Sequence, residues 1–248
     1  CLLSRGLGDV YKRQGRNSIK EALNAGRDIE YLMVSNGEKR GSILQIINLA
    51  KKNNVPVKEV DSRKLDTISG EKHQGVAAIL SAHAYSSVDD ILKVAEDKKE
   101  APFVVIADGV EDPHNLGAII RTAECAGVHG VIIPKRNSAG LSSAVAKTSA
   151  GALEYVKVAR VTNISRLIDD LKNKGFWFYC ADMDGKPYYD IDFDGAVALV
   201  IGGEGKGVSR LVKEKCDFTI SLPLKGKITS LNASVAAGIL MYQIARKR

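Results

Sequence analysis

The features that the chain lacks already narrow its class. It contains no run of about 18 apolar residues, which argues against a membrane-spanning helix. It has only four cysteines in 248 residues and no C-x-x-C pair, so we expect reduced, buried thiols, as in a cytosolic protein. Its four histidines form no H-x-x-x-H pair, and no metal ion is implied. We therefore expect a cytoplasmic protein that binds neither a metal nor a membrane.

The composition that remains is that of an ordinary globular protein. Hydrophobic residues make up 45% of the chain and charged residues 26%, which suits one large domain or two smaller ones. A net charge of +7 is compatible with RNA as a partner but is also common in proteins that bind no nucleic acid. Residues 1–14 begin with Cys1 and show no clean amphipathic period, so we treat them as a suspect non-native leader.

Residues 15–82 are predicted to form a small α/β domain, because their apolar periodicity alternates between that of a helix and that of a strand. Helices are expected at 18–24, 42–53 and near Leu65, and strands at 29–34, 55–60 and 76–81. An amphipathic, acid-tinged helix at 88–96 follows, ahead of Pro102. We interpret residues 83–102 as a linker.

The rest of the chain, 103–248, has the pattern of a parallel α/β domain. Short runs rich in Val, Ile and Phe recur, and helical patterns separate most of them. These runs lie at 103–107, 128–133, 155–158, 176–181, 196–201 and 217–222. Such nearly continuous apolar strands predict a parallel sheet that helices cover on both faces. Ligands of these sheets bind at the loops that follow the carboxyl ends of the strands.

Three loops after predicted strands carry the candidate chemistry, and the first follows the strand at 103–107. Asp112 before Pro113 predicts the start of a helix, whose next two turns contain Asn115 and Arg121. Arg121 is expected beside the buried stripe of that helix, where its guanidinium could hold a phosphate or a carboxylate. A surface arginine in a salt bridge explains this loop, taken alone, at least as well.

The other two loops, 201–207 and 222–232, also allow both a structural and a functional interpretation when each is taken alone. The glycines of the second allow a ligand to approach the backbone closely, but a tight strand-to-helix turn would need them too and would leave Glu204 unexplained. In the third, Ser230 or Asn232 is expected to cap a helix of small residues. Small residues of this kind are typical of a buried core helix or a dimer contact.

In this order and spacing, the three loops resemble the SpoU family of RNA ribose 2'-O-methyltransferases, within the SPOUT group. The matching motifs are N-x-G-x-x-x-R-T-A at 115–123, I-G-G-E-G-x-G at 201–207, L-P-L-x-G-x-x-x-S-L-N at 222–232 and S-x-G-A-x-E at 149–154. Upstream, G-R-N at 15–17 and H-Q-G at 73–75 resemble the RNA-recognition domain of the RlmB branch. The resemblance spans residues 15–248.

The resemblance implies a fold, a cofactor and a set of site residues. It implies an N-terminal domain similar to ribosomal protein L30e that grips RNA, and a C-terminal α/β domain whose last segment threads a trefoil knot around S-adenosylmethionine. It also implies a homodimer, because family active sites form beside the dimer interface. The cofactor would be contacted by Gly202, Gly203, Leu222 and Leu231, and catalysis would involve Arg121, Asn115, Glu204, Ser230 and Asn232.

The predicted reaction is the in-line attack of a ribose 2'-hydroxyl on the sulfonium methyl group. Because arginine is a poor base, we expect Arg121 to clamp the adjacent RNA phosphate and to orient the hydroxyl, or to accept its proton transiently. The favoured target is a guanosine of 23S ribosomal RNA, and the main alternative is a guanosine of tRNA. A non-catalytic RNA-binding protein and a nucleotide-binding dehydrogenase stay open as other classes, although a dehydrogenase leaves the motif at 222–232 without a role.

Overall fold

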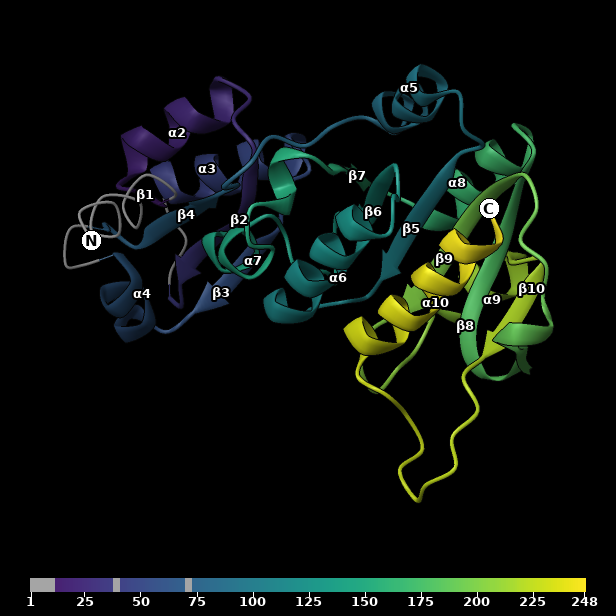
Figure 1. Ribbon diagram of the computed structural model, residues 1–248. Helices are drawn as coiled ribbons and strands as arrows, with labels where there is room; N and C mark the ends of the chain where they lie inside the picture. Colours follow the sequence, from purple (N-terminus) through teal and green to yellow (C-terminus); the bar gives the residue numbers. More distant parts are fainter. Residues whose placement is uncertain (1–11, 38–40, 70–72) are drawn as a thin grey trace. The chain divides into compact units, whose positions relative to one another are not determined.

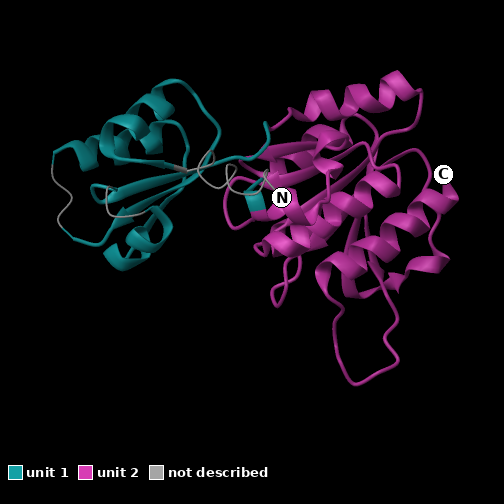
Figure 2. Ribbon diagram, turned by 60° about the vertical axis from the view of Figure 1, so that its left-hand side comes forward, with its two compact units in different colours: residues 1–84, 140–143 teal, residues 85–139, 144–248 magenta. Residues whose placement is uncertain are grey.

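The computed structural model describes residues 12–37, 41–69 and 73–248, which form two compact units (Figure 2). Unit 1 comprises residues 1–84 with 140–143, and unit 2 comprises 85–139 and 144–248. Most of the expected leader, residues 1–11, lies outside the described residues. Its last three residues, Lys12–Gln14, form strand β1 and pair with strand β4 (Val76–Leu80). This part of the expected leader therefore belongs to the sheet of unit 1.

Unit 1 is built on a mixed four-stranded sheet in the order β1-β4-β2-β3. Its other elements are α2 (Arg16–Asn24), β2 (Ile29–Ser35), α3 (Ser42–Lys52), β3 (Val57–Val60) and α4 (Ser62–Ser69). Because side chains alternate along a strand, Leu32 of β2 is buried in one core cluster with α2 and α3, while Met33 is buried in another with Leu65 of α4. The helices and strands expected in this domain are all present.

Unit 2 is built on six parallel strands in the order β10-β8-β9-β5-β6-β7. The strands are β5 (Phe103–Asp108), β6 (Gly130–Pro134), β7 (Lys157–Val161), β8 (Phe176–Pro187), β9 (Ala196–Gly202) and β10 (Phe218–Ser221). The predicted parallel sheet is confirmed. β8 is longer than expected, because beyond Cys180 it leaves β9 and continues beside β10 in a shifted register, with Lys186 opposite Ile220.

Helices cover both faces of this sheet (Figure 1). They are α5 (Val88–Lys98), α6 (Pro113–Cys125), α7 (Ser143–Thr148), α8 (Ile164–Lys172), α9 (Arg210–Lys215) and α10 (Ala233–Lys247), with short 3-10 helices η1 (Ala152–Glu154) and η2 (Tyr188–Asp190). On one face, α6 and α10 pack against each other. On the other, Ile91 of α5, Ile168 of α8 and Val212 of α9 share one core with the strands. None of the described helices is both long and apolar enough to cross a membrane.

Helix α5 lies within the segment 83–102, which the sequence presents as a linker. Ser87 caps it through reciprocal hydrogen bonds with Asp90, and Ile91 is fully buried. Gly130 admits this side chain, since a Cβ on Gly130 would lie 2.5 Å from Ile91 Cγ1. Over α5 the segment is therefore a packed part of unit 2 rather than a free connection, because its apolar stripe is buried.

His129, the residue before β6, is hydrogen-bonded to the start of β5 at the amino-terminal edge of the same sheet. Its Nδ1 accepts a hydrogen bond from the N–H of Phe103 at 2.9 Å, and its Nε2 lies 3.0 Å from Glu100 Oε2. Because Nδ1 accepts, Nε2 carries the proton of the neutral ring. Burial lowers the pKa of His129, and the hydrogen bond with Glu100 opposes that shift. The buried imidazole therefore acts as a neutral structural group.

Candidate active site

The carboxyl ends of β5 and β9 lie side by side and carry two of the three candidate loops. Asp108 and Gly202 are paired across these strands. The carbonyl of Asp108 accepts a hydrogen bond from the N–H of Gly203 at 2.9 Å, and its Oδ2 accepts one from the N–H of Ser209 at 2.8 Å. Asp108 thus closes the glycine loop, 202–207, from the neighbouring strand. Asp108 is not among the residues that the sequence predicts for the site, although a carboxylate at the end of an apolar strand is a signal for such a role.

The glycine loop is shaped by close approaches between backbone segments. A Cβ on Gly203 would lie 1.9 Å from the carbonyl oxygen of Gly109, and one on Gly202 would lie 2.1 Å from the carbonyl carbon of Gly207. The N–H of Gly207 also donates to the carbonyl of Gly203 at 3.0 Å. The crossing of the backbone therefore requires glycine at both positions, whatever binds there. The cofactor contacts expected at Gly202 and Gly203 stay a prediction.

Three side chains from the three loops meet in one hydrogen-bonded group, which we call the polar cluster: Asn115, Glu204 and Asn232. Asn115 Nδ2 donates to Glu204 Oε1 at 2.9 Å, and Asn232 Nδ2 donates to the same oxygen at 2.8 Å. Asn232 Nδ2 also donates to Asn115 Oδ1, at 2.9 Å and across 117 residues of sequence. An oxygen that accepts two amide donors suits an ionised carboxylate. The structure therefore brings together three of the five residues expected in catalysis.

The Asn115 side of the polar cluster is held by the start of α6. The carboxylate of Asp112 accepts hydrogen bonds from the N–H groups of His114 and Asn115, and Pro113 occupies the first turn. The predicted cap and proline are confirmed here. Asn115 is only 6% exposed, so its amide is fixed inside the fold.

The Asn232 side is held by the start of α10. Asn232 Oδ1 accepts hydrogen bonds from the N–H of Ser234 at 2.9 Å and from its hydroxyl at 2.6 Å. Because Oδ1 is committed to the helix, the amide nitrogen must face Glu204. Of the two expected caps, the helix uses Asn232 and not Ser230.

Arg121 stands apart from the polar cluster. It is exposed on α6, whereas Asn115 is buried, because six residues of helix turn the two side chains to different sides. Within residues 12–37, 41–69 and 73–248, Arg121 makes no hydrogen bond and no ion pair. Arg121 therefore has no salt-bridge partner in this part of the chain, and the interpretation as a surface arginine in a salt bridge finds no support there.

The third loop, 222–232, extends away from the sheet between β10 and α10 (Figure 1). Leu222 is half-buried, Ser230 is exposed, and Leu231 is 40% exposed. Over the described chain, residues 223–231 form no hydrogen bond with one another or with other residues. Ser230, Leu222 and Leu231 therefore keep roles that rest on the family resemblance.

Three further motif positions shape the chain at and after α7: Gly117, Ser149 and Gly151. A Cβ on Gly117 would lie 2.6 Å from Thr148 Cβ, so the missing side chain lets α7 come close. Ser149 is fully buried, and its hydroxyl donates to the carbonyl of Ala146 at 2.9 Å. Gly151 then turns the chain with φ of 90°, in the left-handed region. The packing and the turn of the chain account for the small residues at these positions.

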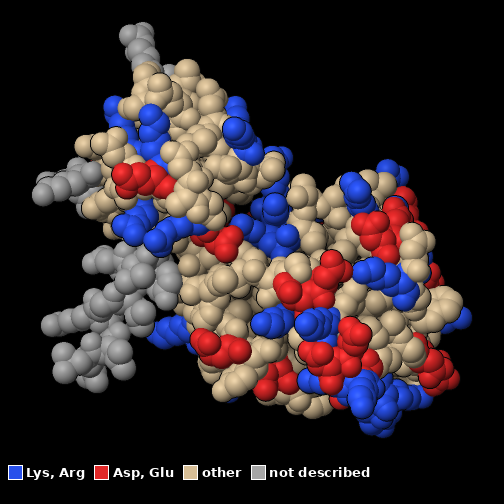
Figure 3. Space-filling model, turned by 90° about the horizontal axis from the view of Figure 1, so that it is seen from above, with Lys and Arg blue, Asp and Glu red and all other residues tan. Residues whose placement is uncertain are grey.

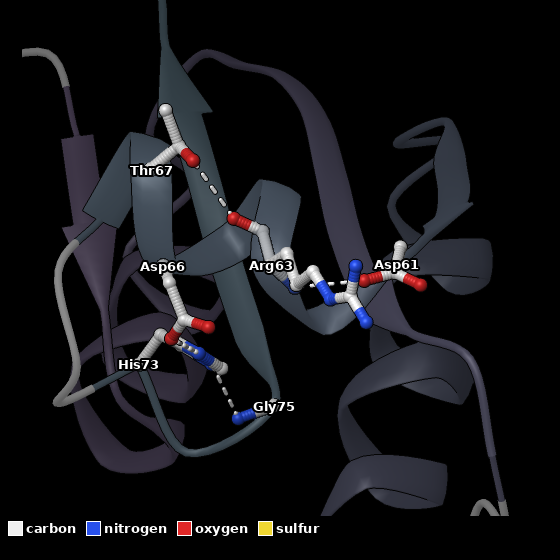
Figure 4. A network of polar contacts seen from close by, with 6 residues as sticks. All are labelled: Asp61, Arg63, Asp66, Thr67, His73 and Gly75. Carbon is white, nitrogen blue, oxygen red and sulfur yellow. Dashed lines mark hydrogen bonds and ion pairs between the residues drawn. The ribbon is translucent and has the colours of Figure 1, made fainter.

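In unit 1 the structure joins the two N-terminal motifs. The N–H of Arg16 donates to Gln74 Oε1 at 3.1 Å, and Arg16 Nε donates to the carbonyl of Gln74 at 3.2 Å. The ring of His73 is buried between Asp66 and the next turn: Nε2 lies 2.8 Å from Asp66 Oδ1, and Nδ1 accepts from the N–H of Gly75 at 2.8 Å (Figure 4). These hydrogen bonds hold the two motifs together just before β4.

Charge and thiols narrow the chemistry further. On the face shown in Figure 3, acidic side chains lie among the basic ones, so charge alone identifies no RNA-binding stripe there. The interaction with Cys180, together with burial, raises the pKa of the Cys216 thiol, which donates a hydrogen bond to the carbonyl of Val212. Cys125 is exposed, contrary to the expectation of buried thiols.

In the described part of the chain, no three His, Cys, Asp or Glu side chains form a group that could hold a metal ion.

Solved structures define the class to which this fold belongs. AviRb, a SpoU methyltransferase from Streptomyces viridochromogenes in complex with AdoMet, matches with a TM-score of 0.60 at 23% identity, over 99% of this chain and 94% of that one. An AdoMet-bound rRNA methyltransferase from Sinorhizobium meliloti matches with a TM-score of 0.61 at 24% identity, over 98% and 92%. At this level of identity the likeness shows the fold alone, which this chain shares with these two methyltransferases.

Sequence comparison identifies the family. Residues 102–242 match the SpoU rRNA Methylase family, and residues 14–86 match the model described as RNA 2'-O ribose methyltransferase substrate binding. YacO of Bacillus subtilis, which carries the name of the TrmH family of tRNA/rRNA methyltransferases, is 48% identical over 235 residues, 94% of each chain. A relative of the same name from Staphylococcus haemolyticus is 46% identical over 94% of each. The chain therefore belongs to the SpoU family of RNA methyltransferases, and the predicted resemblance is confirmed.

Proposed function

We propose that this protein transfers the methyl group of S-adenosylmethionine to a ribose 2'-hydroxyl of RNA in the cytoplasm, with a guanosine of 23S ribosomal RNA as its target. The observation that carries the proposal is the polar cluster, since Asn115, Glu204 and Asn232 come from the three family motifs and meet at the ligand-binding edge of the sheet. The match of residues 14–86 to a substrate-binding model supports unit 1 as the part that grips the RNA.

We assign the binding of the RNA phosphate to Arg121. The reaction requires the 2'-hydroxyl to be aligned with the sulfonium methyl group. Arg121 has five fixed donors, is exposed, and has no partner among the described residues. It therefore clamps the phosphate next to the target ribose, while the polar cluster and Ser230 fix the site.

The cofactor fits the loops at the same edge. When bound, S-adenosylmethionine supplies an electrophilic methyl group, and Gly202, Gly203, Leu222 and Leu231 would hold it. Support comes from the third loop, whose backbone donors and acceptors over 223–231 are unpaired within the described chain, next to exposed apolar side chains. A purine ring needs both kinds of partner. The close backbone crossing at Gly202 and Gly203 is compatible with the trefoil knot that the resemblance implies.

We also propose a homodimer that buries one face of α10. Val235, Ile239 and Tyr242 share that face, because they are spaced by four and three residues, and they are 49%, 38% and 54% exposed. An apolar stripe of this kind is typical of an interface. It begins three residues after Asn232, so a second copy would lie beside the polar cluster. Light scattering tests this: wild type should be a dimer and Ile239→Asp a monomer, and a monomeric wild type would refute it.

The substrate is tested with RNA from a strain that lacks this gene. Purified protein and labelled S-adenosylmethionine should methylate a guanosine ribose of the large ribosomal RNA in that material. Label in tRNA instead would establish the tRNA alternative. Absence of label from every RNA, with cofactor binding intact, would support the non-catalytic alternative.

The role of Arg121 is tested by Arg121→Ala. We expect transfer to be abolished, while calorimetry shows unchanged binding of S-adenosylmethionine, because the guanidinium holds RNA and not the cofactor. Arg121→Lys is the matched variant: it keeps the charge but loses the planar fork, and should recover part of the RNA affinity. Turnover retained in Arg121→Ala would remove this residue from the mechanism.

A further inference from the structure

The close packing of α7 on α6 has an effect at His114, one turn before Gly117. Residues three apart on a helix lie on the same side, so the missing side chain of Gly117 leaves room for Thr148 to reach the imidazole. Thr148 Oγ1 lies 3.3 Å from His114 Nδ1. A side chain on Gly117 would push Thr148 away, because its Cβ would fall 2.6 Å from Thr148 Cβ. A glycine of the family motif thus sets the partner of the neighbouring histidine.

The hydrogen bonds of Thr148 determine which ring nitrogen of His114 carries the proton. The hydroxyl of Thr148 lies 2.9 Å from the carbonyl of Ala144, which can only accept, so the single hydroxyl proton is donated there. In its contact with Nδ1, Thr148 must therefore accept, and Nδ1 must donate. The neutral imidazole is then protonated at Nδ1, and Nε2 keeps its lone pair.

Within the described residues no hydrogen bond engages Nε2 of His114, so this lone pair is available to a ligand. The side chain is exposed, and its own N–H is bonded to Asp112 at 3.1 Å. The next residue, Asn115, is part of the polar cluster. The charged residues nearest to His114 in the sequence are Glu111 and Asp112. Lys147 precedes its partner Thr148 on α7, and Glu204 is bonded to the next residue, Asn115.

We propose that His114 is the proton acceptor of the methyl transfer, and this inference rests on the proposed function. The 2'-hydroxyl oxygen forms a bond to the methyl carbon as the carbon–sulfur bond breaks, and the hydroxyl proton moves to Nε2 of His114. The electron pair of the broken bond stays on sulfur, which becomes a neutral thioether, while the imidazole becomes an imidazolium. Water takes up the proton after the product leaves.

The other candidates for this step are less suited. Arg121 is always protonated and has no lone pair to offer. Glu204 Oε1 already accepts two amide hydrogen bonds, and a carboxylate is in general a weaker base than an imidazole. His114 is the group next to the polar cluster whose hydrogen bonds leave a basic nitrogen free.

The test is the pH dependence of single-turnover methyl transfer in the full-length protein with RNA and S-adenosylmethionine. We expect the wild-type rate to fall on the acid side, as an imidazole base is protonated. His114→Gln should lack this acid limb and should be slower by about 100-fold or more, with unchanged cofactor affinity. If His114→Gln is too slow for a profile, His114→Ala with added imidazole decides, and recovered transfer supports the proposal.

Two matched variants separate this role from a structural one. His83→Gln makes the same change in unit 1 and should keep the acid limb. Thr148→Val removes the acceptor of Nδ1 and should slow transfer by about tenfold while the limb persists. The proposal is overturned if His114→Gln keeps the wild-type limb or a rate within about threefold of wild type, or if imidazole fails to rescue an inactive His114→Ala. If wild type transfers no methyl group, it is the proposed function that fails.

Discussion

The glycine loop, 202–207, and the third loop, 222–232, belong to the same proposed cofactor site but are held in opposite ways. Asp108 binds the glycine loop at both ends, and the space where Gly203 would carry a side chain is filled by the backbone of Gly109. The third loop has no hydrogen bond over 223–231 within the described chain, and Ile228 is 78% exposed.

Because the two loops are held differently, we expect substitutions in them to affect different properties of the protein. The shape of the glycine loop is fixed by the chain itself, so changes there should act on folding. The third loop offers unpaired backbone groups and exposed apolar side chains, so changes there should act on binding and leave stability intact. The polar cluster joins the two loops through Glu204 and Asn232, and changes there should act on both.

The largest effect is expected at Gly203. Gly203→Ala places a Cβ 1.9 Å from the carbonyl oxygen of Gly109. The position of a Cβ is set by its own backbone and its neighbour is backbone, so no side-chain rotation can relieve the clash. We expect a loss of about 3 kcal/mol or more in the free energy of unfolding, measured by urea denaturation. Gly226→Ala, in the third loop, is the control: its Cβ would meet nothing within 4 Å, and stability should be unchanged. Equal losses in the two variants would break the comparison.

Asn232 should show a smaller effect on folding and a large one on transfer. Asn232→Ala removes the cap of α10 and should cost about 1 kcal/mol of stability. Asn232→Ser keeps an acceptor for the helix N–H groups but removes the amide donor to Glu204. We expect it to unfold like wild type but to lose methyl transfer, and a fully active Asn232→Ser would remove this amide from the site.

A smaller effect is expected at the opposite edge of the sheet, where His129 is buried. Burial holds the pKa of His129 below the ordinary value of 6.5, so the unfolded chain takes up a proton first as the pH falls. The stability that the neutral ring contributes is therefore complete above 6.5 and is lost as the pH falls from there through the folded pKa. Denaturation of wild type and His129→Gln across this range should show a larger acid loss in wild type than in the variant.

The smallest effect on folding is expected at Ile228. Because this side chain is 78% exposed, Ile228→Ser should change the free energy of unfolding by less than about 0.5 kcal/mol. If the loop closes over the cofactor, the same variant should bind S-adenosylmethionine about tenfold more weakly, as calorimetry would show. Unchanged affinity would restrict the contacts of this loop to its backbone.

The sequence predicted the scaffold well because its signals are local. Apolar runs separated by helical patterns predicted every strand of the parallel sheet, since its central strands are buried on both faces. Asp112 and Pro113 predicted the start of α6, because a cap depends on residues adjacent in the chain. Where a local pattern had two physical explanations, as with the amphipathic helix α5, the interpretation as a linker missed its burial.

What the sequence by itself determined about this protein is therefore its α/β class, its six parallel strands and its family. The family could be recognised because each of the three ordered motifs is a short run of adjacent residues. Only the tertiary structure decided that Glu204 Oε1 accepts from both Asn115 and Asn232, and that Asp108 closes the glycine loop. It also decided that Thr148 meets His114. These contacts join residues far apart in the chain, and only the packing of strands and helices brings them within hydrogen-bonding distance.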